Sequence, residues 1–412
     1  MSNLQGGMYD AIVIGAGIMG AWTALHLVRR GKRTLLLEQF PLLHTRGSSH
    51  GQSRIFRFAY PEEHQTIMSR DSLDLWRELE ISVGGKTLLK NCPLLRIGEM
   101  PEDHHFIRDC LQSLQHTCPD ESSFQELTSK SIQKDYPGLQ FQDTVKAVVD
   151  YNGGVLLADS CLKACLQVFQ TLGGTLKDST KISSILPGSV VRVTDIYGQE
   201  YLSKSLVIAC GGWSDRLLRE LDLHLPLAVV KIPIVYFRIR PGFEKHPKFA
   251  WIVHDPKYRE IWGIPESEYP GLWKFGSHYG PVIDPDFRDS TDVGYVVENV
   301  SKFVKKHFKF LDPTPAIVEH CMYTITPDSL CILDRHARYP NISFACGFSG
   351  SGFKLSPMVG KIMADFACGV TPPEYVKESL SAQRFSNVQP RWIQHHSQVK
   401  WYNKDVQKMG NL

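Results

Sequence analysis

The sequence predicts an α/β domain with a parallel sheet, into which a second domain of antiparallel strands is inserted. Three observations favour this architecture. The chain begins with a β-branched run, a glycine-rich turn and an apolar helical stretch, within residues 9–37. A strand, a glycine turn and a helix start follow one another again near residues 206–216 and 342–367. Between these two returns, short aromatic and β-branched runs are typical of an antiparallel sheet.

Length and composition indicate a globular protein with two cores. A chain of 412 residues, 42% of them hydrophobic and 22% charged, is too long for one ordinary core and too apolar for disorder. The net charge of +3 gives no reason to expect nucleic acid or a membrane surface as a partner. No apolar run approaches the ~20 residues of a membrane span. The first residues lack the basic and apolar regions of a secretory signal, so none is expected.

Cysteine usage predicts free thiols and no metal site. The ten cysteines have no regular spacing and form no Cys-x-x-Cys pair. Free thiols are the expectation for a long chain without a secretory signal. Because the sequence shows no closely spaced cysteine and histidine ligands, no zinc site is expected.

The opening unit has the pattern of a strand, a helix and a second strand. Residues 9–14 are typical of a buried parallel strand, and apolar side chains then repeat at helical spacing as far as Val28. A charged turn, 29–33, precedes a second strand at 34–37, which ends at Glu38. This order is that of the first unit of a Rossmann-like, dinucleotide-binding domain.

Three glycines between the first strand and the helix form a G-x-G-x-x-G fingerprint. Gly15 permits a tight turn, Gly17 lets the backbone approach a pyrophosphate, and Gly20 lets the helix pack closely on the strand. The helix N-terminus adds partial positive charge, and Glu38 can accept hydrogen bonds from a ribose hydroxyl. The fingerprint therefore predicts a dinucleotide site; the alternative is a glycine-rich turn that binds nothing.

The remaining elements alternate in the order that a doubly wound domain with an insertion requires. The elements expected before the insertion are a helix at 63–80, a strand-like stretch at 87–96, polar helical stretches up to 134, a strand near 145–154, a helix at 159–172 and a strand at 206–209. Strands of the inserted domain are expected in IPIVYFRI, FAWIVHD, IWGIPE and GLWKFGSHYG. The predicted boundaries are 8–92, 145–222 and 321–386 for the discontinuous nucleotide domain, 93–144 and 223–320 for the inserted α+β domain, and 387–412 for a mobile tail.

The fingerprint alone does not separate NAD from FAD. Three features favour FAD: its position near the start of the chain, the repeated return of the chain to the nucleotide domain, and a late glycine turn. In that turn, Gly350 and Gly352 can bring backbone amides, and Lys354 a cation, against a ring system.

Five motifs in order give the chain a specific resemblance. They are GAGIMG, GSSHGQSRIFRFAY, GLWKFGSHYG, HCMYTITPD and CGFSGSGFKLSPMVG. The chain resembles the monomeric sarcosine oxidase family over about residues 8–385. The resemblance implies an FAD-binding domain of the glutathione-reductase type, an antiparallel substrate domain, oxidation of secondary amino acids by oxygen, and hydrogen peroxide as product.

The resemblance also implies how the flavin and the substrate are held. Cys321 matches the cysteine that the family bonds to the flavin; the alternative is a buried free cysteine. Arg57 and Lys354 match the residues that hold the substrate carboxylate, which a guanidinium fork and a point charge suit. Trp262 stands where the bacterial members carry a tyrosine beside the substrate. This changed wall favours a cyclic substrate such as pipecolate or proline over sarcosine.

Four further residues match catalytic positions of the family. Lys274 matches the lysine over the flavin N5, where a cation stabilises charge on reduced oxygen. His278 matches the histidine near the substrate and lies four residues on, so it shares a strand face with Lys274. His50 and Arg54 match a pair on the opposite flavin face. The alternative for each residue is an ordinary structural histidine or ion pair.

The sequence thus predicts an FAD-dependent oxidase of L-pipecolate, sarcosine or L-proline, acting as a monomer. Alternatives are another amine-oxidising flavoprotein, of the D-amino acid oxidase or dimethylglycine dehydrogenase type, and a nucleotide-binding protein without turnover. The resemblance implies a peroxisomal location, although the C-terminal Gly-Asn-Leu is a poor targeting signal, so the cytosol is the alternative.

Overall fold

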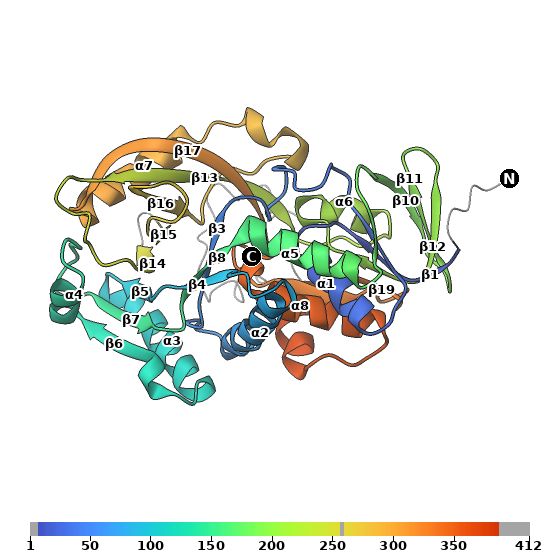
Figure 1. Ribbon diagram of the computed structural model, residues 1–412, viewed down its shortest axis with the longest axis horizontal. Coiled ribbons are helices and arrows are strands. Elements are labelled where there is room, and N and C mark those ends of the chain that lie inside the picture. The colour runs from blue at the N-terminus through green and yellow to red at the C-terminus, as the bar shows by residue number, and fades with distance from the viewer. Residues whose placement is uncertain (1–6, 256–258, 387–412) are drawn as a thin grey trace.

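The computed structural model describes residues 7–255 and 259–386, and the tail predicted at 387–412 lies outside these ranges. Two eight-stranded sheets lie side by side in the molecule, one in each half, with a three-stranded sheet between them (Figure 1). We call them the first sheet, the second sheet and the small sheet. Each large sheet has its own buried apolar cluster, and a further cluster contains residues of both sheets, among them Val13 and Ile232.

The first sheet is built around β1 (Tyr9–Ile14), which pairs in parallel with β2 (Thr34–Leu37) and β12 (Glu200–Ile208). The last strand to join is β19 (Ile342–Cys346), which pairs in parallel with the end of β12. The predicted strands at 9–14, 34–37 and 206–209 and the late return of the chain are therefore confirmed. The other strands of this sheet are β9 (Thr175–Lys177), β10 (Ile182–Leu186), β11 (Val191–Asp195) and β18 (Ile332–Arg335).

Helices cover the first sheet where the sequence showed helical periodicity. The fingerprint helix is α1 (Ile18–Arg29), which packs against α8 (Gly352–Ala367) and α5 (Ala158–Thr171). A Cβ on Gly360 of α8 would lie 2.6 Å from the backbone of Trp22, so α1 and α8 are in close contact. Two further helices are α2 (Glu63–Ser82), which packs against α8, and the short α6 (Ser214–Arg219).

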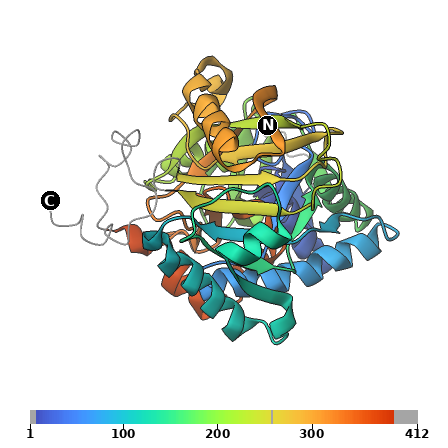
Figure 2. The ribbon, with the colours of Figure 1, turned by 90° about the vertical axis from the view of Figure 1, so that its left-hand side faces the viewer.

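The second sheet runs in the order β17-β13-β16-β15-β14-β5-β7-β6 and is antiparallel except between β14 and β5. Its strands are β5 (Leu94–Gly98), β6 (Phe124–Thr128), β7 (Lys146–Asp150), β13 (Ala228–Ile239), β14 (Ala250–Asp255), β15 (Arg259–Ile264), β16 (Leu272–Ser277) and β17 (Leu311–Ile325). All four aromatic runs are strands, as predicted. Its helices are α3 (His104–Thr117), α4 (Ser129–Asp135) and α7 (Gly294–His307). Figure 2 views this half from its end, with the orange α7 above the strands and the teal α3 below.

Two predicted boundaries fall inside the second sheet. The strand β7 was expected to open a nucleotide-domain segment at 145, but it pairs with β5 and β6. Likewise 321 lies within β17, whose whole length pairs with β13. An apolar run of four or five residues shows that a strand is buried but not which sheet buries it, so the sequence could not place these two boundaries.

The small sheet joins the two halves. It contains β3 (Ser53–Phe56), β8 (Gly154–Leu157) and β4 (Leu89–Asn91), with β8 in the middle. It carries Arg54 within β3 and Arg57 directly after it.

A buried histidine, His26 of α1, links α1 to α8 through a hydrogen bond from Nε2 to the carbonyl of Pro357, at 3.0 Å. Burial, assisted by the charge of Arg29, lowers the pKa of His26 to about 3. In the unfolded chain the same side chain has a pKa of about 6.5, so below that pH the unfolded state binds the extra proton.

We therefore expect the free energy of unfolding to fall as the pH drops from about 6.5 towards 3, by up to ~1.4 kcal/mol per pH unit for this residue. His26→Gln keeps a donor for Pro357 but removes the titration, so its stability should depend less on pH. Urea denaturation at several pH values measures the slope. The exposed His105→Gln serves as the control, and a slope in His26→Gln equal to that of the control would contradict the assignment.

Candidate functional site

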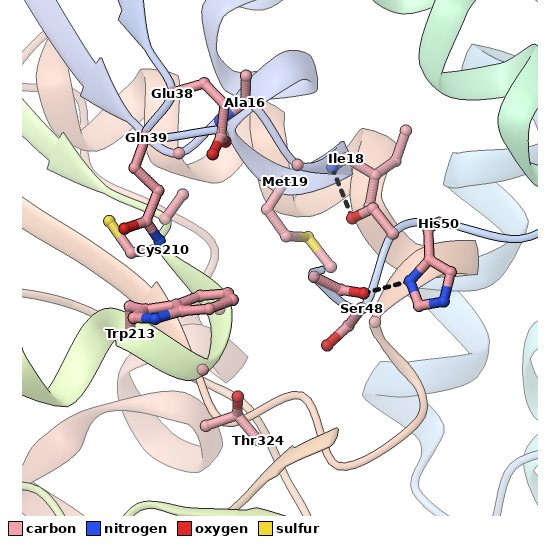
Figure 3. Close-up of a pocket in the computed structure, with 18 of the residues that line it drawn as sticks. Ala16, Ile18, Met19, Glu38, Gln39, Ser48, His50, Cys210, Trp213 and Thr324 are labelled. Atoms are coloured by element: carbon pink, nitrogen blue, oxygen red, sulfur yellow. Dashed lines mark hydrogen bonds between the residues drawn. The ribbon is translucent and has the colours of Figure 1, made fainter. Parts of the chain in front are cut away.

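A deep cleft opens at the carboxyl ends of β1 and β12. It encloses roughly 1600 Å³ of empty space, a figure that includes space open to solvent. Its walls come from the fingerprint turn, the end of β2, the loop at 47–50, the turn after β12 and the glycine turn before α8. In Figure 3, Glu38, Gln39 and Trp213 lie on one side of the cleft, and Ser48 and His50 lie on the other.

The fingerprint glycines have no room for side chains. Gly15 has a φ of +100°, and a Cβ there would lie 2.5 Å from the carbonyl oxygen of Ala209. A Cβ on Gly20 would lie 1.8 Å from the carbonyl oxygen of Gly15, and one on Gly17 would lie 3.0 Å from Ser49 Oγ. These contacts bring the amides at the start of α1 against the cleft, where helix-terminal charge attracts phosphate.

Glu38 is fixed at the end of β2. Its carboxylate accepts hydrogen bonds from the amides of Ala16, at 2.8 Å, and Phe40, at 3.1 Å, and lies 3.4 Å from His44 Nε2. The carboxylate therefore lies beside the fingerprint turn, in the cleft wall.

The loop at 47–54 lies against β17. Arg54 donates to the carbonyls of Ser48 and Ser53, at 3.0 and 2.7 Å, and its guanidinium lies 5.6 Å from the centre of the Phe353 ring. His50 contacts the carbonyls of Gly47 and His320. Burial lowers the pKa of His50, and the two carbonyls oppose this shift.

Cys321 lies on β17 between the two residues that contact this loop. Ser48 Oγ donates to the carbonyl of Met322 at 2.7 Å, and His50 contacts the carbonyl of His320 at 3.3 Å. The Cys321 side chain is buried, and its Sγ lies 3.7 Å from the carbonyl of Met322. It lies next to Met322 and Tyr323 but is not itself among the residues that line the cleft.

A buried polar cluster adjoins the glycine turn before α8; we define it as Arg57, Tyr60, Glu260, Trp262, His278 and Lys354. A Cβ on Gly350 would lie 2.8 Å from His278 Nδ1 and from Tyr323 Cε2, so only this turn separates the cluster from the cleft. Arg57 Nε and Nη1, Tyr60 Oη, Trp262 Nε1 and His278 Nδ1 are buried without a hydrogen-bond partner. Since buried polar groups nearly always have partners, unpaired groups that cluster together indicate a site for a polar ligand.

Two cations lie on either side of Tyr60 in this cluster. The Arg57 guanidinium stacks on the Tyr60 ring at 4.1 Å from its centre, and Lys354 Nζ lies 6.0 Å from the same centre. Burial and the charge of Arg57 lower the pKa of Lys354. Burial also acts against the charge of Arg57, but Tyr60 and Glu260 keep its pKa above the ordinary value. Two buried cations with few acceptors favour an anionic ligand.

A carboxylate fixes the backbone that follows Arg57. Asp150 Oδ2, at the end of β7, accepts hydrogen bonds from the amides of Phe58 and Ala59, at 2.5 and 3.0 Å. The second sheet thus positions the segment that carries one of the two cations.

Lys274 points into a separate buried network. Its ammonium lies 2.6 Å from Glu268 Oε1 and donates to Ser53 Oγ at 3.2 Å. Glu268 also accepts from Tyr236, whose hydroxyl lies 3.0 Å from Glu319. Burial lowers the pKa of Lys274, and the charge of Glu268 opposes this shift.

The structure brings the predicted residues together in three groups. Those at the cleft are Gly15, Gly17, Glu38, His50, Arg54, Gly350 and Gly352; those in the buried polar cluster are Arg57, Trp262, His278 and Lys354; and Lys274 lies in the network with Glu268. Gly20 underlies the fingerprint turn.

The sequence analysis missed Tyr323, Tyr60, Glu260 and Glu268. Two of them carried a usable signal, because residues two apart on a strand share a face: Glu260 precedes Trp262 by two, and Tyr323 follows Cys321 by two.

Within the described ranges, no group of three or more potential metal ligands is found. All ten cysteines are free. No helix in the described part of the chain is long and apolar enough to cross a membrane.

A Rossmann-like sheet with a fingerprint turn, and a cleft at the carboxyl ends of its strands, indicate a dinucleotide-binding protein. The chain matches the family model described as DAO, FAD dependent oxidoreductase, over residues 10–366. It therefore belongs to the DAO family of FAD-dependent oxidoreductases, within which its relatives are sarcosine oxidases. The predicted flavoprotein enzyme and the predicted family are thereby confirmed.

Two relatives and two solved structures show the extent of the similarity. The chain is 41% identical over 381 residues to the peroxisomal sarcosine oxidase of Homo sapiens, covering 89% of this chain and 94% of that protein. It is 30% identical over 369 residues to the monomeric sarcosine oxidase of Arthrobacter sp., covering 87% and 92%. The fold is similar to that of NikD, an unusual amino acid oxidase (TM-score 0.78, 21% identity, 91% and 98% covered), and of glycine oxidase from Geobacillus kaustophilus (0.74, 18%, 91% and 99%).

Proposed function

We propose that this protein is an FAD-dependent oxidase of secondary amino acids that produces an imine and hydrogen peroxide. The observation that carries the proposal is the buried polar cluster. It contains two buried cations with few acceptors, and an unpaired histidine nitrogen that faces the glycine turn of the cleft. FAD, when bound, takes up hydride equivalents from the carbon next to the amine and passes them to oxygen. The protein supplies binding, orientation and electrostatics.

The residues of the cleft suit FAD. Glu38 is placed for ribose hydroxyls, and the amides at the start of α1, behind Gly15 and Gly17, are placed for the pyrophosphate. Gly350 and Gly352 also line the cleft, so we propose that the backbone of this turn lies beside the flavin ring system. We propose a discontinuous FAD-binding domain around the first sheet and a substrate domain around the second sheet, with β7 and all of β17 assigned to the substrate domain.

For the substrate, we propose that Arg57 and Lys354 hold the carboxylate and that the amine lies towards His278. Trp262, with its Nε1 buried and unpaired, forms part of the wall. A wide aromatic wall favours a ring-shaped substrate, so L-pipecolate and L-proline are proposed above sarcosine. Anaerobic mixing of the purified protein with each compound tests this ranking, because the substrate bleaches the flavin absorption. If no secondary amino acid bleaches the flavin absorption, the proposal is wrong.

Cys321 is the proposed site of a covalent bond to the flavin, since the carbonyls of its two neighbours on β17 contact the loop that lines the cleft. We expect acid-precipitated protein to be yellow and Cys321→Ala to give a colourless pellet, because only a covalent bond survives denaturation. Cys331→Ala is the matched control, as this cysteine is also buried but lies after β17. A yellow Cys321→Ala pellet, or a colourless wild-type pellet, would leave Cys321 as an ordinary core thiol.

Lys274 is proposed to place positive charge where oxygen is reduced. We expect Lys274→Met to slow reoxidation of the reduced protein by oxygen roughly 10²- to 10³-fold, the usual effect of losing one electrostatic donor to a charged transition state. Reduction by the amine should change far less. Stopped-flow measurement of the two half-reactions checks this, and equal slowing of both would assign Lys274 a structural role instead.

Two other functions remain as outcomes of these measurements. In a flavoprotein of the D-amino acid oxidase or dimethylglycine dehydrogenase type, D-amino acids or tertiary amines would bleach the flavin absorption in place of L-pipecolate. In a nucleotide-binding protein without turnover, FAD would be bound but none of these compounds would bleach its absorption. By similarity to its relatives, we also propose a monomer in the peroxisome, with the cytosol as the alternative.

A further inference from the structure

The two ring nitrogens of His278 have different surroundings. Nε2 lies 3.2 Å from Glu260 Oε2. Nδ1 is buried, has no hydrogen-bond partner, and faces the glycine turn at Gly350, beside Tyr323. One nitrogen is therefore held by the protein, and the other is left for something that enters the cluster.

Glu260 can act only as an acceptor towards His278. Its second oxygen, Oε1, pairs with Nη2 of the buried Arg96. Burial alone would raise the pKa of Glu260, but the charges of Arg96, His278 and Arg57 hold it at about 2, so the side chain is ionised. A carboxylate without a proton accepts hydrogen bonds and donates none.

His278 is neutral in the same surroundings. Burial lowers its pKa to about 4, and the charges of Arg57, Lys354 and Arg96 act in the same direction, against Glu260. A neutral imidazole carries one N–H. Since Glu260 requires a donor, the proton is on Nε2, and Nδ1 carries a lone pair.

We infer that Glu260 is a positioning residue: it fixes His278 as the Nε2–H tautomer, so that Nδ1 accepts a hydrogen bond from the amino N–H of the substrate. The cluster then offers donors at Arg57 and Lys354 for the carboxylate and one acceptor for the nitrogen. This inference rests on the proposed function and adds to it a requirement for an N–H group in the ligand.

A nearly isosteric change inverts this arrangement. In Glu260→Gln, Arg96 can only donate, so it takes the amide oxygen and leaves the NH₂ group facing His278 Nε2. Nε2 must then accept, and the imidazole proton moves to Nδ1. The variant thus presents a donor to the ligand in place of an acceptor.

The test uses the FAD-loaded protein and two carboxylates that differ at one ring atom. Pyrrole-2-carboxylate offers an N–H, whereas furan-2-carboxylate has a ring oxygen. Their binding is measured from the change in flavin absorption. We expect the wild type to bind pyrrole-2-carboxylate about tenfold more tightly than furan-2-carboxylate. The pyrrole N–H donates one hydrogen bond to His278 Nδ1, whereas the furan leaves this nitrogen unpaired. Glu260→Gln should lose this preference. Glu62→Gln, which removes another carboxyl near Arg57 and Arg96 without contact to His278, should keep it.

The tautomer itself is read from ¹⁵N–¹H correlation spectra of labelled wild-type protein, with the His278 signals assigned by their loss in His278→Gln. Protonated Nε2 is the expected result, and this measurement decides the inference if Glu260→Gln does not fold. Protonated Nδ1, or an unchanged preference in a folded Glu260→Gln, would overturn it. If secondary amino acids bleach the flavin in either of those cases, the proposed function stands and only the role of Glu260 fails.

Discussion

Gly20→Ala is expected to give a protein that cannot load FAD. The added Cβ would lie 1.8 Å from the carbonyl oxygen of Gly15 and 3.3 Å from Val13, and neither can move without opening the contact between α1 and β1. Because both the turn at Gly15 and the amides that face the cleft depend on this contact, the pyrophosphate site and the packing are lost together. We expect little or no flavin absorption in the purified variant, and a loss of several kcal/mol in stability.

The matched control is Gly294→Ala, at the first residue of α7. A Cβ there would be in ordinary van der Waals contact, 3.4 Å from Asp292 Oδ1. The substitution also replaces a glycine in a helix by alanine, a better helix former. It should retain full flavin content. A Gly20→Ala protein with one FAD per chain would show that α1 can shift away from β1, and the fingerprint would then not need this glycine.

Arg57→Met is expected to lower kcat/KM by roughly 10²- to 10³-fold, about 3–4 kcal/mol, since the substrate carboxylate would lose two charge-assisted hydrogen bonds. The same change should alter the stability of the ligand-free protein little. Two nitrogens of the buried guanidinium have no partner, but Tyr60 and Glu260 stabilise its charge, so methionine removes a cost and a gain together while keeping most of the volume.

A large loss of activity with little change in melting temperature would therefore identify Arg57 as a ligand-binding residue. Steady-state kinetics with L-pipecolate and thermal melts of the ligand-free protein measure the two quantities. Arg70→Met serves as the control, because Arg70 lies on α2, partly exposed, and pairs with Asp71. If Arg57→Met lowered stability and left kcat/KM unchanged, Arg57 would hold the fold and not the substrate.

The first βαβ unit could be predicted from the sequence because each of its parts has a local cause. β1 and β2 match the predicted residue ranges, since a buried parallel strand is a continuous apolar run and the glycine turn marks where it ends. β17 was not recognised as a strand. Its residues 312–319 alternate exposed and partly exposed side chains with two prolines among them, and its strand character comes from pairing with β13.

The family resemblance implied that Arg57 and Lys354 belong to one site, and the structure places both beside Tyr60; that they bind a carboxylate stays a prediction. The site could not be predicted where a contact depends on a partner far away in the chain. Glu268 lies six residues from Lys274, yet the network also needs Ser53 and Tyr236. Arg96 and Glu260 meet only because β5 and β15 lie on either side of β14 in the second sheet.

The late joining of β19 and α8 fixes when an active molecule can exist during synthesis. Until the ribosome has passed residue 346, the end of β12 is an open sheet edge, and open edges pair with other chains. Lys354 follows within ten residues, at the start of α8. A chain that stops before this point therefore has both an aggregation-prone edge and an incomplete anion site. Prematurely terminated products should therefore be insoluble and inactive.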